Sequence, residues 1–144
     1  TDAVTGPALR IAPLYKEAIN GDAVTIDIMA EDLSNVSGAE ILLIFDASVL
    51  AYQSIDKGEF FGRAQGQVLE ITTLKTSNLL QIDIGAYNGT YPAASGSGVI
   101  ATLHFNTLKV GQSALTLQQD CSLRDKDNNV LTYNILVNGL VDVK

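Results

Sequence analysis

Apolar and polar residues alternate along most of the chain. Val24, Ile26 and Ile28, for example, alternate with Thr25 and Asp27. Successive side chains of an extended strand point to opposite faces, so this period of two is typical of a β-strand with one buried face. We find no convincing amphipathic helix pattern, and the sequence therefore predicts an all-β protein.

Turn signals divide the alternating pattern into about nine short strands, a spacing that favours a sandwich or a barrel. The expected strands are residues 9–12, 24–31, 38–46, 49–55, 68–74, 79–86, 99–106, 115–117 and 135–143. Residues 75–78 would connect a hairpin, and Gly89 to Gly98 are expected to form a loop because they are rich in Gly, Ser, Ala and Pro. Phe60 and Phe61 are expected to plug the end of the core.

Composition narrows the classes of function. The chain has 144 residues, of which 47% are hydrophobic and 17% charged, so we expect residues 1–144 to form a single domain with a sizeable core. Its net charge is −7 and it has no cluster of Lys or Arg, which argues against nucleic-acid binding. No apolar run approaches the roughly 20 residues of a membrane span. Because the chain begins with Thr1 rather than Met, we interpret it as a processed or excised piece.

Few side chains could carry catalysis or hold a metal. The chain has one His, one Cys and no Trp. His104 lies on the polar side of its strand without a nucleophile elbow, so we expect a surface histidine. Cys121 is expected to be a buried structural thiol. Asp125 to Asn129 begin like a calcium loop, but Val130 and Leu136 stand where an EF-hand needs Gly and Glu. We therefore expect a turn there, with no metal, no cofactor and no enzyme activity.

One strand breaks the alternation. In the expected strand 38–46, Leu42 and Ile44 point to the face away from the core, yet both are apolar. A strand with one solvated face should alternate more cleanly. Either these residues form a protein-binding patch, rimmed by Glu40, Gln81 and Asp83, or another segment covers them. A second cluster, Tyr87-Asn88-Gly89-Thr90-Tyr91, either stacks a sugar or caps the core.

Segments spread over nearly the whole chain resemble motifs of the cohesin family, in the same order. They are Gly38 to Leu50, Gly96 to Phe105, Leu123 to Asn129 and Asn138 to Val143. The first segment resembles the family's pattern of a glycine, a strand of alternating residues, a turn like aromatic-Asp-Pro-Ser, and then Val-Leu. Ala47 stands where the family usually has Pro. The last resembles a closing Asn-Gly-x-Val-x-Val strand.

This resemblance implies a two-sheet antiparallel β-sandwich of jelly-roll topology. It also implies a non-catalytic, secreted or cell-surface module that binds dockerins, which are small helical domains carrying their own calcium. The residues expected to contact the partner are Glu40, Leu42, Ile44, Glu70, Thr72, Gln81, Asp83, Tyr87 and Asn88. The alternatives are a carbohydrate-binding module, which would bind polysaccharide through Tyr87 and Tyr91, and a structural sandwich within an adhesin.

Overall fold

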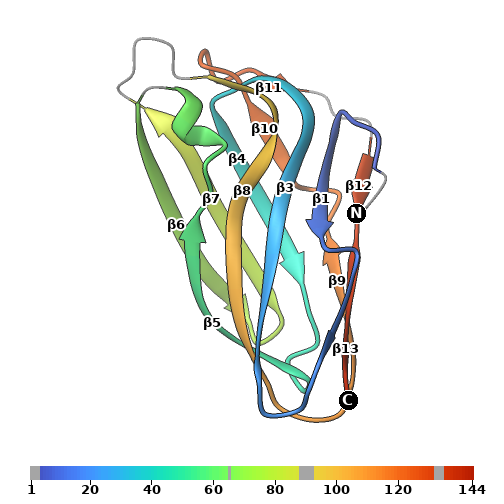
Figure 1. Ribbon diagram of the computed structural model, residues 1–144. Coiled ribbons are helices and arrows are strands. Elements are labelled where there is room, and N and C mark those ends of the chain that lie inside the picture. The colour runs from blue at the N-terminus through green and yellow to red at the C-terminus, as the bar shows by residue number, and fades with distance from the viewer. Residues whose placement is uncertain (1–3, 65, 88–92, 132–134) are drawn as a thin grey trace.

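Strands dominate the computed structural model, which describes residues 4–64, 66–87, 93–131 and 135–144. Within those residues there are thirteen strands and one short 3₁₀ helix, η1 (Phe61–Ala64). No helix of this described part is long and apolar enough to cross a membrane. The strands form two sheets that pack face to face, and Figure 1 shows β3 and β8 crossing in front of β4 and β7.

The first sheet has five strands in the order β12-β1-β3-β8-β5. Its centre is the long antiparallel pair of β3 and β8, and β12 runs parallel to β1 at one edge. The bounds of its members are β1 (Ala8–Ala12), β3 (Ala23–Val36), β5 (Leu50–Lys57), β8 (Ala94–Thr107) and β12 (Ile135–Val137).

The second sheet is organised around β4. One side of β4 pairs with β7, which pairs in turn with the edge strand β6, and the other side pairs first with β10 and then with β9. Beyond them lie β11, β13 and β2. The bounds are β2 (Tyr15–Ala18), β4 (Gly38–Ile44), β6 (Gln67–Thr76), β7 (Leu79–Tyr87), β9 (Gly111–Leu117), β10 (Ser122–Arg124), β11 (Val130–Leu131) and β13 (Gly139–Val143).

The core fills the space between the two sheets. Alternate residues of β4 and β7, such as Ile41 and Ile82, are fully buried against it. The ring of Phe105 on β8 lies edge-on to Phe45 at 5.2 Å between centroids. Removal of these apolar surfaces from water is what holds the sheets together. Phe60, which is fully buried like its neighbour in η1, closes one end of the core, as the sequence predicted.

The predicted two-sheet sandwich is confirmed, with three differences in detail. There are more strands than expected, and two pairs, β1 with β12 and β2 with β13, are parallel. The expected strand 135–143 divides at Asn138 into one strand in each sheet, β12 and β13. A Cβ at Gly139 would lie 2.5 Å from Cγ2 of Ile11, so the backbone there passes too close to β1 for any larger residue.

The expectation of a loop from Gly89 to Gly98 is wrong for its second half, because β8 begins at Ala94. Serine hydroxyls replace missing backbone acceptors along this irregular part of the pair with β3. Ser97 Oγ accepts the Asp32 N–H, and Ser95 Oγ accepts the Asn35 N–H, both at 2.9 Å. The composition that suggested a loop therefore supports a bulged strand. Residues 88–92 of the expected loop lie outside the described part of the chain.

Candidate functional site

The outer face of the second sheet contains most of the residues that the sequence singled out. On β4, Ile41 is buried and its neighbours Glu40 and Leu42 point outward and are partly exposed. Glu40 lies directly opposite Asp83 of β7, and Leu42 lies opposite Gln81. Residues paired across two strands share one face of the sheet. We call the outward-pointing side of β6, β7, β4 and β9 the outer face.

The edge strand β6 adds two apolar side chains that the sequence analysis missed. Leu69 lies opposite Gly85 and Ile71 lies opposite Asp83, so both point outward. Their exposed fractions are 53% and 64%, which is high for residues of this kind. The apolar part of the outer face is therefore wider than Leu42 and Ile44, the two residues that the sequence placed there.

Glu70 and Thr72 lie on the other side of β6. They pair with Ile84 and Ile82, which are core residues, so they point inward. The Thr72 hydroxyl donates a hydrogen bond to Glu70. Burial, and then the nearby charge of Glu70, raise the pKa of the Tyr52 hydroxyl. The structure thus corrects the expected position of these two residues: they line the open edge between the sheets and are not on the outer face.

An acidic cluster lies in the middle of the outer face. The Gln81 Nε2 group donates to Glu40 Oε1 at 3.2 Å and to Asp83 Oδ2 at 3.1 Å. Within the described part of the chain, none of the ion pairs involves either carboxylate. Directly opposed like charges on neighbouring strands repel one another. One side-chain amide thus holds together two carboxylates that have no cationic partner among those ion pairs.

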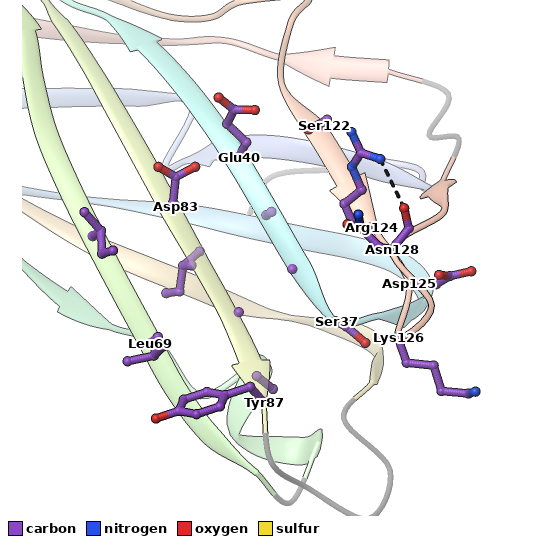
Figure 2. Close-up of a pocket in the computed structure, with 16 residues that line it drawn as sticks. Ser37, Glu40, Leu69, Asp83, Tyr87, Ser122, Arg124, Asp125, Lys126 and Asn128 are labelled. Atoms are coloured by element: carbon purple, nitrogen blue, oxygen red, sulfur yellow. Dashed lines mark hydrogen bonds between the residues drawn. The ribbon is translucent and has the colours of Figure 1, made fainter.

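The outer face is hollowed over a volume of about 520 Å³, and Glu40 and Asp83 of the acidic cluster line one part of this hollow. Gly38 and Gly85, which pair across β4 and β7, form its floor without side chains. Figure 2 shows Leu69 and Tyr87 on one side of this space and Arg124 on the other. We call it the glycine hollow. Its remaining lining residues include Ile71, Ser122, Asp125, Lys126 and Asn128.

The two floor glycines differ in what they would tolerate. A Cβ on Gly85 would lie 2.6 Å from the Ser37 carbonyl oxygen, a distance that real structures do not show. That same oxygen accepts the Ala86 N–H at 2.8 Å, so the backbone there cannot easily move. A Cβ on Gly38 would be 3.7 Å from the nearest atom, the Ile84 carbonyl oxygen, which is an ordinary contact. A side chain could therefore be added to the floor at Gly38 alone.

A second hollow, of about 500 Å³, lies at the other end of β4. Ile44 and Thr116 pair across β4 and β9 at its edge, and Asn78 of the β6–β7 turn lines it as well. Asp46 accepts hydrogen bonds from both the backbone N–H and the hydroxyl of Ser48, which lower the pKa of its carboxyl. The outer face thus carries a polar hollow at one end and the glycine hollow at the other.

The tyrosine cluster gives little support for sugar stacking. The Tyr87 hydroxyl donates to Gln67 Oε1 at 2.6 Å, and its ring lines the glycine hollow. Asn88 and Tyr91, the other two residues named for this region, lie outside the described residues.

The side chains of His104 and Cys121 are each hydrogen-bonded to neighbouring residues of the fold. His104 is on the opposite sheet, where its Nε2 atom lies 2.7 Å from Asp56 Oδ2 and Nδ1 lies 3.4 Å from the Thr25 hydroxyl. Cys121 is buried beside β4, and its Sγ accepts the Leu42 N–H at 3.3 Å. Burial raises the pKa of this thiol, which keeps it protonated and unreactive.

Asp125 organises the turn between β10 and β11. Its Oδ1 atom accepts the backbone N–H groups of Asp127 and Asn129, each at 2.9 Å, and the Asn129 contact is the main reason why the pKa of its carboxyl is lowered. This is how aspartate stabilises a tight turn. No group of His, Cys, Asp and Glu that could hold a metal occurs among the described residues.

The structure is thus a sandwich of two sheets, one of which has an apolar and acidic outer face. The sequence profile of the cohesin domain family matches residues 16–143. The chain therefore belongs to the cohesin domain family, which confirms the resemblance seen in its motifs. No curated protein matches the sequence closely enough to be counted as a relative.

Solved structures show the same fold at low sequence identity. A non-cellulosomal cohesin from the archaeon Archaeoglobus fulgidus has a TM-score of 0.78 and 20% identity, covering 98% of this chain and 92% of that one. The sixth cohesin of scaffoldin B from Acetivibrio cellulolyticus, solved in complex with a mutant dockerin, has a TM-score of 0.78 and 19% identity, and the match covers 98% of this chain and 100% of that one. A type I cohesin–dockerin complex from Clostridium thermocellum has a TM-score of 0.76 and 15% identity, and the match covers 98% of this chain and 100% of that one.

The sequence analysis missed several residues of the outer face, among them Gly38, Leu69, Ile71 and Gly85. Gly85 did carry a signal, because a glycine inside a strand pattern indicates a close backbone approach, whereas Gly38 is the first residue of its strand and has no such close contact. Leu69 and Ile71 carried none, since an apolar residue on an alternating strand is ordinarily assigned to the core.

Proposed function

We propose that this protein is a non-catalytic docking module that binds a dockerin domain through its outer face. The observation that carries the proposal is the exposed apolar surface of Leu69 and Ile71 beside the acidic pair of Glu40 and Asp83, on the sandwich of a cohesin. Related folds solved as cohesin–dockerin complexes support it. Residues 1–144 would act as one secreted or cell-surface unit, and any calcium would belong to the dockerin.

The composition of the outer face fits a protein partner. Burying apolar surface contributes roughly 25 cal/mol of favourable free energy per Å². The entropy lost on association and on ordering the side chains opposes this gain. Interfaces commonly combine an apolar centre with a polar rim, and a few central residues carry most of the binding energy. Leu42, Leu69 and Ile71 would form that centre, and the carboxylates of Glu40 and Asp83 would add orientation and a faster encounter.

No observation among the described residues favours the carbohydrate-binding alternative. The chain has no Trp, and the hydroxyl of Tyr87 is already bonded to Gln67. Sugar platforms need aromatic faces presented together, and the outer face instead presents aliphatic side chains and carboxylates. We therefore propose the docking function alone.

The experiment is a binding titration against a panel of calcium-loaded dockerins of both cellulosomal and non-cellulosomal origin. We expect one or more to bind, and we expect Ile71→Asp to abolish binding without lowering the melting temperature. Ile19→Asp is the matched control, because Ile19 is 65% exposed, against 64% for Ile71, but lies in the turn before β3. The proposal is wrong if no dockerin binds, or if Ile71→Asp binds as tightly as Ile19→Asp.

A further inference from the structure

The edge strand β6 offers a second surface for association, separate from the outer face. β6 pairs with β7 alone, and Figure 1 shows it at the outer margin of its sheet. We propose that two copies of this protein associate by pairing their β6 strands antiparallel, so that the second sheet continues from one copy into the other. This inference goes beyond the docking function, because it concerns the backbone edge of the sheet and a second copy of this chain.

Among the sheet edges in the described part of the chain, β6 is the longest regular one. It has 10 residues, whereas the edge strands β2, β11 and β12 have 4, 2 and 3. The edge strand β5 has 8 residues, but a register shift interrupts its pairing with β8. From Gln67 to Leu74, β6 pairs with β7 without such a shift. A long, regular edge is a template on which another strand can pair.

The free edge of β6 presents backbone groups that β7 does not use. Ala86 lies opposite Val68, and its N–H bonds to the Ser37 carbonyl on the β4 side of β7. Opposite residues of an antiparallel pair direct their backbone groups either toward each other or both away. Val68 therefore directs its N–H and C=O to the free edge, where Lys57 Nζ donates to the carbonyl oxygen at 3.2 Å. Every second residue onward from Val68 shares this direction.

Glu70 and Thr72 are the next two residues that direct their N–H and C=O to the free edge. A twofold axis through Ile71, perpendicular to the sheet, places Glu70 of one copy opposite the partner's Thr72. Each such pair exchanges two backbone hydrogen bonds, and the axis generates the pair twice. The side chains match as well, because the Thr72 hydroxyl already donates to Glu70 within one copy. At Val68, a backbone N–H of the partner would replace Lys57 Nζ as the donor.

The outward side chains of β6 are self-complementary in this register. Ile71 is 64% exposed and would lie against the partner's Ile71. Leu69 is 53% exposed and would lie against the partner's Thr73, which presents a methyl group. Removing this aliphatic surface from water favours association.

Neighbouring registers are less favourable. An axis through Glu70 would set two carboxylates directly opposite each other, where like charges repel. An axis through Thr72 would set Glu70 against the partner's Leu74 and Leu69 against the partner's Lys75. The registers between these would bring an outward side chain opposite an inward one, which a twofold axis perpendicular to the sheet does not allow. The residues of β6 therefore select the axis through Ile71.

The test is sedimentation equilibrium of the wild-type protein, without any dockerin, from about 1 μM to about 1 mM at physiological ionic strength. We expect a reversible equilibrium between monomer and dimer. Ile71→Lys sets two ammonium groups face to face at the axis and should weaken the dimer by at least about tenfold. Ile19→Lys is the matched control, because it adds the same charge at a residue that is 65% exposed in the turn before β3.

Two variants of Thr72 test the backbone pairing. Thr72→Pro removes an N–H that points to the free edge, and an edge strand is where a sheet tolerates Pro, so we expect a folded protein with a dimer weakened by a similar factor. Thr72→Val keeps that N–H and loses only the hydroxyl, so it should dimerise like the wild-type protein. Melting temperatures verify that each variant is folded. If Thr72→Pro is not, the comparison of Ile71→Lys with Ile19→Lys decides.

Disulfide crosslinking checks the register. Opposite residues of a pair without backbone hydrogen bonds have Cα atoms about 4.5 Å apart, which a disulfide can span. Ile71→Cys should therefore give disulfide-linked dimers when it is incubated with oxidised glutathione. Leu69→Cys should not link to itself, but it should link to Thr73→Cys when the two variants are mixed. The wild-type protein, whose Cys121 is buried, is the control.

The outcomes decide the inference independently of docking. A wild-type protein that stays monomeric up to about 1 mM overturns it. A dimer that Ile71→Lys weakens no more than Ile19→Lys does, or self-linking of Leu69→Cys as efficient as that of Ile71→Cys, overturns it as well. A dimer that Ile71→Lys weakens, with the expected crosslinks, supports it. Because dockerin is absent from every measurement, none of these results bears on the proposed docking function.

Discussion

At the scale of single residues, Gly38 and Gly85 contribute to the site by lacking side chains. They form adjacent floor positions, yet only Gly85 is forced to be glycine by its surroundings, because the Ser37 carbonyl occupies the place of its Cβ. Gly38 has room for a methyl group. Packing therefore requires a glycine at the β7 position of the floor but not at the β4 position. Substituting each glycine in turn tests this local structure directly.

We predict that Gly85→Ala destabilises the protein by about 1–3 kcal/mol, the usual cost of forcing an atom into a filled space. Gly38→Ala should be neutral or slightly stabilising, because replacing glycine restricts the unfolded chain. Thermal or urea unfolding of the two variants gives the comparison. Equal stability of Gly85→Ala and the wild-type protein would show that the β3–β4 junction around Ser37 moves more easily than its hydrogen bond to Ala86 suggests.

At the scale of elements, the β10–β11 hairpin depends on one carboxylate. The backbone N–H of Asn129, together with that of Asp127, bonds to Asp125 and lowers the pKa of its carboxyl below the ordinary 3.8. A group whose pKa is lowered by folding stabilises the folded state above its unfolded pKa. That contribution is lost as the pH falls through the folded value.

We therefore predict that acidification from about pH 5 toward pH 2 lowers the melting temperature of the wild-type protein more than that of Asp125→Asn. The asparagine keeps an oxygen for the two N–H groups but does not titrate. Asp127→Asn is the control, since the Asp127 side chain is exposed and, among the described residues, pairs with Lys126 alone. Parallel pH profiles for all three proteins would contradict the assigned role of Asp125. Some acid sensitivity should persist in every variant, because folding also lowers the pKa of Asp46.

The same scale shows why the sequence indicates which residues of β4 face the core but not which residues of β6 do. On β4, Ile41 and Leu43 are buried and the opposite positions hold mixed residues, so the inward side was clear. On β6 the apolar Leu69 and Ile71 point outward, and Glu70 points toward the space between the two sheets. Because β6 is an edge strand beyond most of the core, burial does not decide which residues face inward, and the period of two alone cannot assign the faces.

At the scale of the whole molecule, the two outer surfaces of the sandwich differ in how far their polar groups are satisfied. On the five-stranded sheet, polar side chains pair with one another: Arg10 Nε with Glu31 Oε1 at 2.7 Å, and His104 Nε2 with Asp56 Oδ2 at the same distance. On the other sheet, the two central carboxylates share one amide and are flanked by exposed aliphatic residues. That contrast is why we propose the outer face, and not the five-stranded sheet, as the surface for a partner.

The last prediction separates that face from the core it covers. Ile82 is fully buried on β7 and lies opposite Ile41, so Ile82→Asp places a charge inside the sandwich. That should cost on the order of 4–5 kcal/mol or more, comparable to the whole stability of many domains, and unfold the protein. Leu42 is only partly buried on the outer face, so Leu42→Asp should keep a cooperative thermal transition with a modestly lower midpoint and should greatly weaken dockerin binding.

Thermal melts and binding titrations of both variants check this difference. A midpoint for Leu42→Asp as low as that of Ile82→Asp would show that Leu42 belongs to the core and is not offered to a partner. A stable Leu42→Asp that still binds dockerin as tightly as the wild-type protein would move the interface toward Leu69 and Ile71 at the edge strand. Only a folded Leu42→Asp with weakened binding places the centre of the interface on β4, where the acidic cluster and the glycine hollow meet.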